Sequence, residues 1–192
     1  HISDYTGCRP EEVLVGNGCT ELISLFIQIN HPKKALIVSP TYSEYEREVR
    51  LNGGEVDYYA LQESNDFQLD VEDFCNTLER ESADLCVICN PNNPTGILTP
   101  RSVVKKLLDK AKALDVRVCL DECFLDFLQQ RDALTAKPLL QAAPNLVILK
   151  AFTKLYAMAG VRLGYALCSD TALLDKMRAA GQPWAGSGLA QA

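Results

Sequence analysis

The sequence lacks long apolar runs and clusters of basic residues. No hydrophobic stretch approaches the ~20 residues that a membrane-spanning helix needs, and 19 lysines and arginines are scattered among 25 aspartates and glutamates. The formal net charge of −6 disfavours nucleic acid and anionic membranes as partners. Internal repeats, low-complexity tracts and interdomain linkers are also missing. We therefore expect one globular domain that acts on small molecules.

Cysteine, in contrast, is abundant, with eight residues in a chain of 192. Most of these cysteines lie inside apolar runs, as Cys86 and Cys89 do, which favours buried, reduced thiols in a cytoplasmic protein. Cys86 and Cys89 have the spacing of a metal-binding or redox pair. Residues three apart on a strand point to opposite faces, however, so these two thiols are not expected to share an ion. We therefore predict no metal site.

Short, continuously apolar runs alternate with segments that carry apolar residues at helical spacing. Strands are expected at 11–15, 35–38, 56–60, 85–89, 116–120 and 146–149, with a further strand-like run ending at Cys168, and helices at 22–29, 41–51, 69–80 and 99–114. This alternation is typical of an α/β fold in which a mostly parallel sheet carries helices on both faces.

Polar residues follow the carboxyl ends of the expected strands, which is where open α/β sheets bind their ligands. Asn93 lies in a turn-rich loop after one strand, Asp121 directly follows the next, and Lys154 follows the strand 146–149. A glycine turn ending at Gly18 opens a helix near Thr20, and a helix N-terminus of this kind attracts phosphate.

Lys154 and Arg162 together indicate a particular cofactor chemistry. A charged lysine at the end of a buried strand is costly, and an amine of lowered pKa suits Schiff-base formation with a carbonyl. Arg162 has the forked guanidinium that binds phosphate well. A cofactor with both an aldehyde and a phosphate is pyridoxal 5′-phosphate (PLP). The competing interpretation is a lysine that simply extends its charged end into water.

The motifs, in their order and spacing, resemble those of the fold-type I, class I/II aminotransferases that use PLP. The resemblance is strongest to the branch that holds histidinol-phosphate aminotransferase and threonine-phosphate decarboxylase. The matching segments are 15–21, 39–45, 90–96, 120–127, 152–165 and 182–184. The resemblance implies that residues 1–192 form the PLP-binding large domain, without the family's N-terminal arm and C-terminal small domain.

The resemblance also implies roles for single residues. Lys154 is expected to form the Schiff base and to move the proton at the substrate's alpha carbon. Asp121 is expected to pair with the pyridine nitrogen, Asn93 to donate a hydrogen bond to the phenolic oxygen, and Tyr42 to stack on the ring. Tyr45, in contrast, is interpreted as plain helix surface or core.

The phosphate of the cofactor is expected to be bound by backbone and side-chain groups of Gly18, Cys19, Thr20, Thr153 and Arg162. Three features depart from the family pattern. Ala151 replaces the usual Ser or Thr, which removes one hydrogen bond to phosphate. Phe124 replaces the Tyr of many members, as it does in the decarboxylase-like ones. The segment 186–188, Gly-Ser-Gly, stands where bulkier residues are usual.

The function implied by the resemblance is that of a histidinol-phosphate aminotransferase-like enzyme. Such an enzyme transfers an amino group from an amino acid or amino-phosphate substrate to a 2-oxo acid, and the intact protein is expected to be a homodimer. Two alternatives remain open. One is decarboxylation of a phosphorylated amino acid by the same fold, and the other is a non-catalytic PLP-sensing domain of a regulator.

Overall fold

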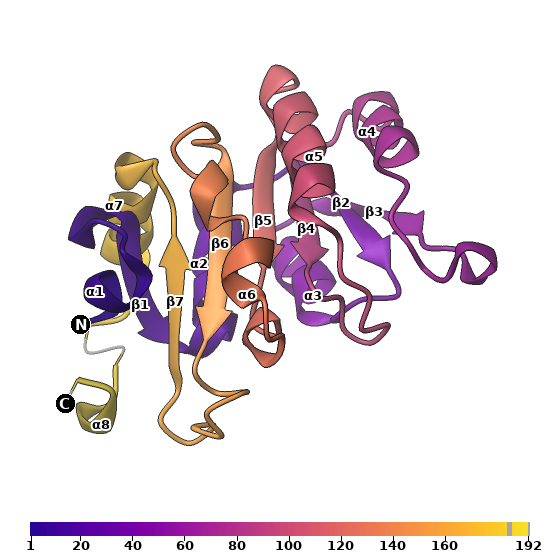
Figure 1. Cartoon of the computed structure of the whole chain (residues 1–192). Coiled ribbons are helices and arrows are strands. Elements are labelled where there is room, and N and C mark those ends of the chain that lie inside the picture. Colours follow the sequence, from indigo (N-terminus) through magenta and orange to yellow (C-terminus); the bar gives the residue numbers. More distant parts are fainter. Residues whose placement is uncertain (184–185, 192) are drawn as a thin grey trace.

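The computed structural model describes residues 1–183 and 186–191, and a seven-stranded sheet lies at its centre (Figure 1). The strands lie side by side in the order β1-β7-β6-β5-β4-β2-β3. Their bounds are β1 Val13–Asn17, β2 Lys34–Ser39, β3 Glu55–Ala60, β4 Leu85–Cys89, β5 Arg117–Asp121, β6 Leu146–Ala151 and β7 Leu163–Leu167.

Neighbouring strands are parallel except where β7 pairs with β1 and with β6. The predicted mostly parallel sheet is therefore confirmed. The antiparallel direction of β7 has a simple cause. Only residues 152–162 connect β6 to β7, and a parallel connection needs a crossover of roughly a dozen or more residues, usually with a helix.

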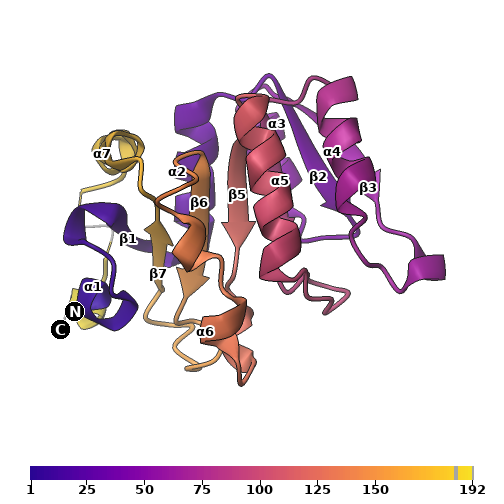
Figure 2. The same cartoon turned by 45° about the horizontal axis from the view of Figure 1, so that its top comes forward.

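Helices cover both faces of the sheet, as Figure 2 shows. The bounds of the α-helices are α1 Ile2–Thr6, α2 Gly18–Asn30, α3 Glu44–Leu51, α4 Val71–Arg80, α5 Arg101–Ala113, α6 Arg131–Leu134, α7 Thr171–Ala180 and α8 Gly188–Gln191. Buried side chains of α4 and α5 pack on one face, while those of α2, α3 and α7 pack on the other. The prediction of an α/β fold with helices on both faces of the sheet is confirmed.

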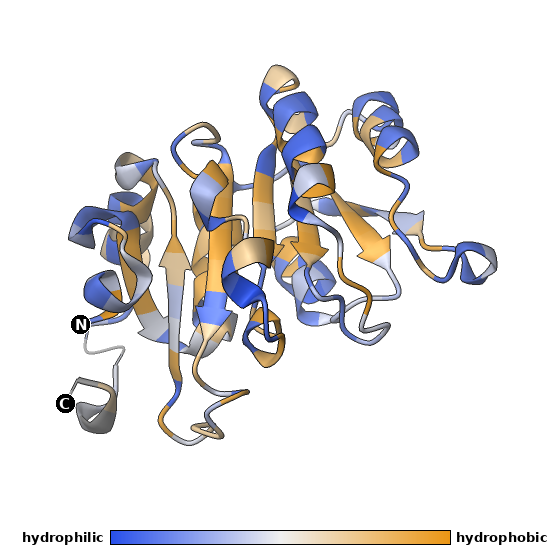
Figure 3. Cartoon of the chain, in the orientation of Figure 1, coloured by the Kyte–Doolittle hydropathy of each residue, from blue (hydrophilic) through white to orange (hydrophobic). Residues whose placement is uncertain are grey.

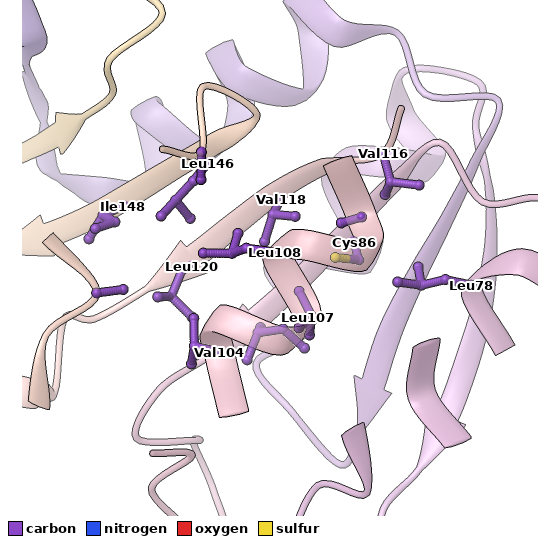
Figure 4. Close-up of a cluster of buried hydrophobic side chains, with 14 of the residues drawn as sticks. Leu78, Cys86, Val104, Leu107, Leu108, Val116, Val118, Leu120, Leu146 and Ile148 are labelled. Atoms are coloured by element: carbon purple, nitrogen blue, oxygen red, sulfur yellow. The ribbon is translucent and has the colours of Figure 1, made fainter. Parts of the chain in front are cut away.

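Alternating side chains of each central strand feed two separate hydrophobic clusters. In β4, Cys86 and Ile88 belong to the cluster beneath α5, whereas Leu85, Val87 and Cys89 belong to the cluster on the α2 side. Figure 4 shows Cys86 among the leucines and valines of the first cluster. Figure 3 shows that the hydrophobic residues concentrate on the strands, while the outward turns of α4 and α5 are hydrophilic.

This alternation confirms that Cys86 and Cys89 point to opposite faces of the sheet. All eight cysteines are free, and most of them are buried, as predicted. None of the helices in the described residues combines the length and the apolar character that a membrane span requires. Trp184, which closes the last matching segment, lies outside the described residues.

Candidate active site

The strands β5 and β6 point toward the same edge of the sheet, the lower edge in Figure 2, and a pocket of about 130 Å³ opens there. The predicted site residues that line this pocket come from segments far apart in the sequence. They are Cys19, Thr20, Tyr42, Asn93, Asp121, Thr153, Lys154 and Arg162. The predicted residues therefore lie together at the carboxyl ends of the strands, where open α/β sheets bind their ligands.

Gly18, the remaining predicted residue, packs against the guanidinium of Arg162. It begins α2 with a φ of +77°, and a Cβ placed on it would lie 2.5 Å from Nη2 of Arg162. Gly164 of β7 is packed as tightly against the same turn, because a Cβ there would lie 2.8 Å from the backbone nitrogen of Cys19. Both positions need glycine so that the guanidinium and the first turn of α2 can lie side by side.

The backbone of Arg162 is itself in the left-handed region, with a φ of 56°. This conformation is uncommon outside glycine and costs free energy. This backbone conformation places the guanidinium beside the N-terminal turn of α2. The first turn of a helix has backbone N–H groups without partners inside the helix, and the positive end of the helix dipole lies there. Arg162 and this turn together form a positively charged cradle for an anion.

Asp121 is the buried carboxylate of the pocket, with only 5% of its surface exposed. One oxygen accepts a hydrogen bond of 2.7 Å from the hydroxyl of Tyr45, and the other accepts one of 2.9 Å from the backbone N–H of Cys123. Each carboxylate oxygen offers about two acceptor positions, so these two bonds do not exhaust the capacity of the carboxylate to accept from a ligand. The two donors hold the carboxylate plane in a fixed orientation.

Tyr45 is thus a functional neighbour that the sequence interpretation missed. It is completely buried on α3, and its ring meets that of Tyr42 edge-on, with centroids 5.5 Å apart. Burial, with the negative charge of Asp121 next in size, raises the pKa of Tyr45 well above its ordinary value, so the hydroxyl remains a donor. A signal was present, because Tyr45 lies only three residues after Tyr42, in the same sequence segment.

Lys154 differs from the expectation in one respect. It lies in the loop after β6 and is exposed rather than desolvated. Its Nζ lies over the ring of Phe124, 5.3 Å from the centroid, a position suited to a cation–π contact. Phe124 therefore contributes a ring face beneath the amine.

The turn-rich loop after β4 contains three asparagines. The side chains of two of them hold the loop in place, and the third lines the pocket. Asn90 makes two hydrogen bonds with the backbone of Thr99, of 2.9 and 2.7 Å. Asn92 donates to the carbonyl oxygen of Pro40, at 2.9 Å, which ties the loop to the end of β2. Asn93 lines the pocket. These hydrogen bonds hold the loop that carries Asn93 at the mouth of the strands.

The donor set of this pocket fits PLP. The cradle of Arg162 and the first turn of α2 suits a phosphate, and the hydroxyl of Thr153 lies in the same pocket. The free acceptor positions of Asp121 suit a protonated pyridine nitrogen. Lys154 supplies an amine for the aldehyde. Ala151, buried at the end of β6, supplies no hydroxyl for the phosphate.

Comparisons with known proteins identify the family. The model of "Aminotransferase class I and II" matches residues 2–192. Threonine-phosphate decarboxylase of Salmonella typhimurium is 35% identical over 93% of this chain and 48% of its own length. Histidinol-phosphate aminotransferase of Desulfitobacterium hafniense is 35% identical over 95% of this chain and 50% of its own length. The structure of a decarboxylase from Sulfurospirillum multivorans superimposes with a TM-score of 0.89 and 32% identity, covering 99% of this chain and 54% of that one.

The chain therefore belongs to the class I/II aminotransferase family, within the branch of histidinol-phosphate aminotransferase and threonine-phosphate decarboxylase. Its fold is that of the large domain of fold-type I aminotransferases. The chain spans about half the length of the curated relatives that it matches.

Proposed function

We propose that this chain is the PLP-binding large domain of an enzyme that acts on a phosphorylated amino compound. The observation that carries the proposal is the convergence of Lys154, Asp121 and Arg162 on one pocket, together with the other lining residues named above. The relatives support the substrate class, because threonine-phosphate, L-serine phosphate and histidinol-phosphate all appear in their names. We further propose that the intact protein is a homodimer.

When bound, PLP supplies a ring that withdraws electrons from the substrate's alpha carbon. The residues of the chain do the remaining work. Arg162, Thr153 and the first turn of α2 hold the phosphate by charge and hydrogen bonds. Asp121 would hold a proton on the pyridine nitrogen, and Tyr42 would stack on the ring. Lys154 anchors the aldehyde and moves a proton at the alpha carbon.

Two reactions are candidates for this site. Transamination to a 2-oxo acid is the first, because the matching family model is that of the aminotransferases and one of the reported relatives is histidinol-phosphate aminotransferase. Decarboxylation is the second, and a specific observation favours it: Phe124 lines the pocket, and the resemblance places the tyrosine of many aminotransferases at this position.

The test begins with the absorption spectrum of the chain after addition of PLP. We expect a visible band that is lost in Lys154→Ala, and borohydride reduction followed by peptide mapping should place the pyridoxyl group on Lys154. Lys137→Ala is the matched control, because Lys137 lies in a different pocket and should leave the band unchanged. A band that persists without Lys154, or a label on another lysine, would contradict the assigned Schiff-base residue.

The full-length protein then separates the two reactions. Release of carbon dioxide from a phosphorylated amino acid would support decarboxylation. Conversion of a 2-oxo acid to its amino acid, with the phosphorylated amine as donor, would support transamination. Absence of the Lys154-dependent band in the full-length protein as well would overturn the proposal that it is a PLP enzyme.

A further inference from the structure

Two cysteines face each other inside the anion end of the pocket. Cys19 lies in the first turn of α2 and Cys123 follows the end of β5, so 104 positions separate them in the sequence. The thiol of Cys123 donates to the sulfur of Cys19, and the two sulfur atoms are 3.2 Å apart. A disulfide bond has a sulfur separation of about 2.05 Å, so the two atoms need to approach by only about 1 Å.

The surroundings of the two thiols differ in access. Both thiols line the pocket, but Cys19 is partly exposed, whereas Cys123 is buried with 6% of its surface exposed. The hydrogen bond to Cys19 and burial raise the pKa of Cys123 well above its ordinary value, so Cys123 stays protonated at neutral pH. An oxidant that enters through the pocket therefore reaches Cys19 first. Cys123 stands behind it as a resolving thiol.

We propose that Cys19 and Cys123 form a redox-modification site, which a peroxide or a comparable two-electron oxidant converts to a disulfide. The thiol of Cys19 first releases its proton to solvent, and the sulfur then attacks one peroxide oxygen. The O–O bond breaks, Cys19 becomes a sulfenic acid, and the departing hydroxide takes up a proton from solvent to form water. The sulfur of Cys123 then attacks Cys19, and the departing hydroxide takes the Cys123 proton to form a second water. Two thiols and one hydrogen peroxide thus yield one disulfide and two waters.

The disulfide alters the anion cradle because Cys19 is one of its residues. In the reduced chain, the thiol of Cys19 donates to the carbonyl oxygen of Lys150 at 2.9 Å, which ties the start of α2 to β6. Oxidation removes this donor and ties the same turn to the segment after β5. We expect the oxidised chain to bind PLP about tenfold more weakly, the equivalent of one well-made hydrogen bond. This consequence rests on the proposed function, whereas formation of the disulfide does not.

The decisive measurement is peptide mapping of the full chain after treatment with hydrogen peroxide. The reduced chain is oxidised in the folded state, its remaining thiols are alkylated, and the digest is analysed by mass spectrometry. We expect a peptide that links Cys19 to Cys123 to dominate. Cys168→Ser is the matched control, because Cys168 is a buried thiol outside the pocket, and it should leave the yield of the link unchanged. In Cys123→Ser, Cys19 should accumulate as a sulfenic acid that dimedone traps.

The outcomes separate cleanly. Oxidation of other cysteines without the Cys19–Cys123 link overturns the proposal, as does a link that forms only when the chain is unfolded in urea. A link that forms while the affinity for PLP stays unchanged would retain the site and refute its effect on the cradle. If neither the reduced chain nor the full-length protein binds PLP, the proposed function fails, and the link still decides whether the thiol pair is a redox site.

Discussion

Replacing Tyr45 with phenylalanine isolates the hydrogen bond that holds Asp121. The change removes one hydroxyl and leaves the ring, so it creates almost no cavity in the core. The oxygen of Asp121 that accepts the 2.7 Å bond from Tyr45 loses its donor in a site where Asp121 is 5% exposed. Water has little access to replace the lost donor. The second oxygen keeps its bond from the backbone N–H of Cys123.

The expected cost follows from the charge of the acceptor. Hydrogen bonds to charged groups contribute about 1.5–3 kcal/mol, and an unsatisfied buried group costs a similar amount. We therefore expect Tyr45→Phe to lower the free energy of unfolding by about 2 kcal/mol. Urea unfolding of the apo chain, followed by circular dichroism and extrapolated linearly to water, measures this difference.

Tyr59→Phe is the matched control. The hydroxyl of Tyr59 also donates to a carboxylate, that of Asp73 at 3.0 Å, but this bond lies at the exposed surface. Water can replace the donor there, so the loss should stay below about 1 kcal/mol. Equal losses for Tyr45→Phe and Tyr59→Phe would refute the conclusion that burial makes the bond to Asp121 strong. A stabilised Tyr45→Phe chain would show that the hydroxyl strains the site.

Two further substitutions test the packing beside the pocket. Lys150 is buried on β6, and its Nζ lies 3.4 Å from the fully buried Glu122. Lys150→Met should therefore lower the free energy of unfolding, measured in urea, by about 3–5 kcal/mol. Lys105→Met, which breaks the exposed ion pair with Asp109, should cost under about 0.5 kcal/mol. Gly164→Ala places a Cβ 2.8 Å from backbone at the start of α2 and should cost about 1–3 kcal/mol, whereas Gly160→Ala, which meets nothing within 4 Å, should change the unfolding midpoint little.

The sequence was sufficient for the layered fold and for most of the candidate pocket. Continuous apolar strands that alternate with amphipathic helices leave few arrangements in which both faces of a sheet are covered. Chain topology then sends the ends of parallel strands to one edge. Asn93, Asp121 and Lys154 could therefore be placed together by their position after strands, before any side-chain contact was known.

Several features depended on the tertiary structure because they join residues that no local pattern relates. The bond from Tyr45 to Asp121 spans 76 positions, and the contact between Cys19 and Cys123 spans 104. The apolar strand before Lys154 did not predict that this lysine is exposed, because Lys154 lies in the loop after β6 and outside the core. Hydrophobic periodicity reports which face of an element is buried, and it carries no information on which buried groups meet across the sheet.

The sequence by itself thus determined the α/β class, the edge of the sheet where the pocket lies and most of its lining residues. Only the tertiary structure decided which donors hold Asp121 and which thiols face each other, because these contacts depend on strand register and helix packing. Periodicity is a local property of the chain, whereas a pocket is built from distances between segments that the chain brings together only when it folds.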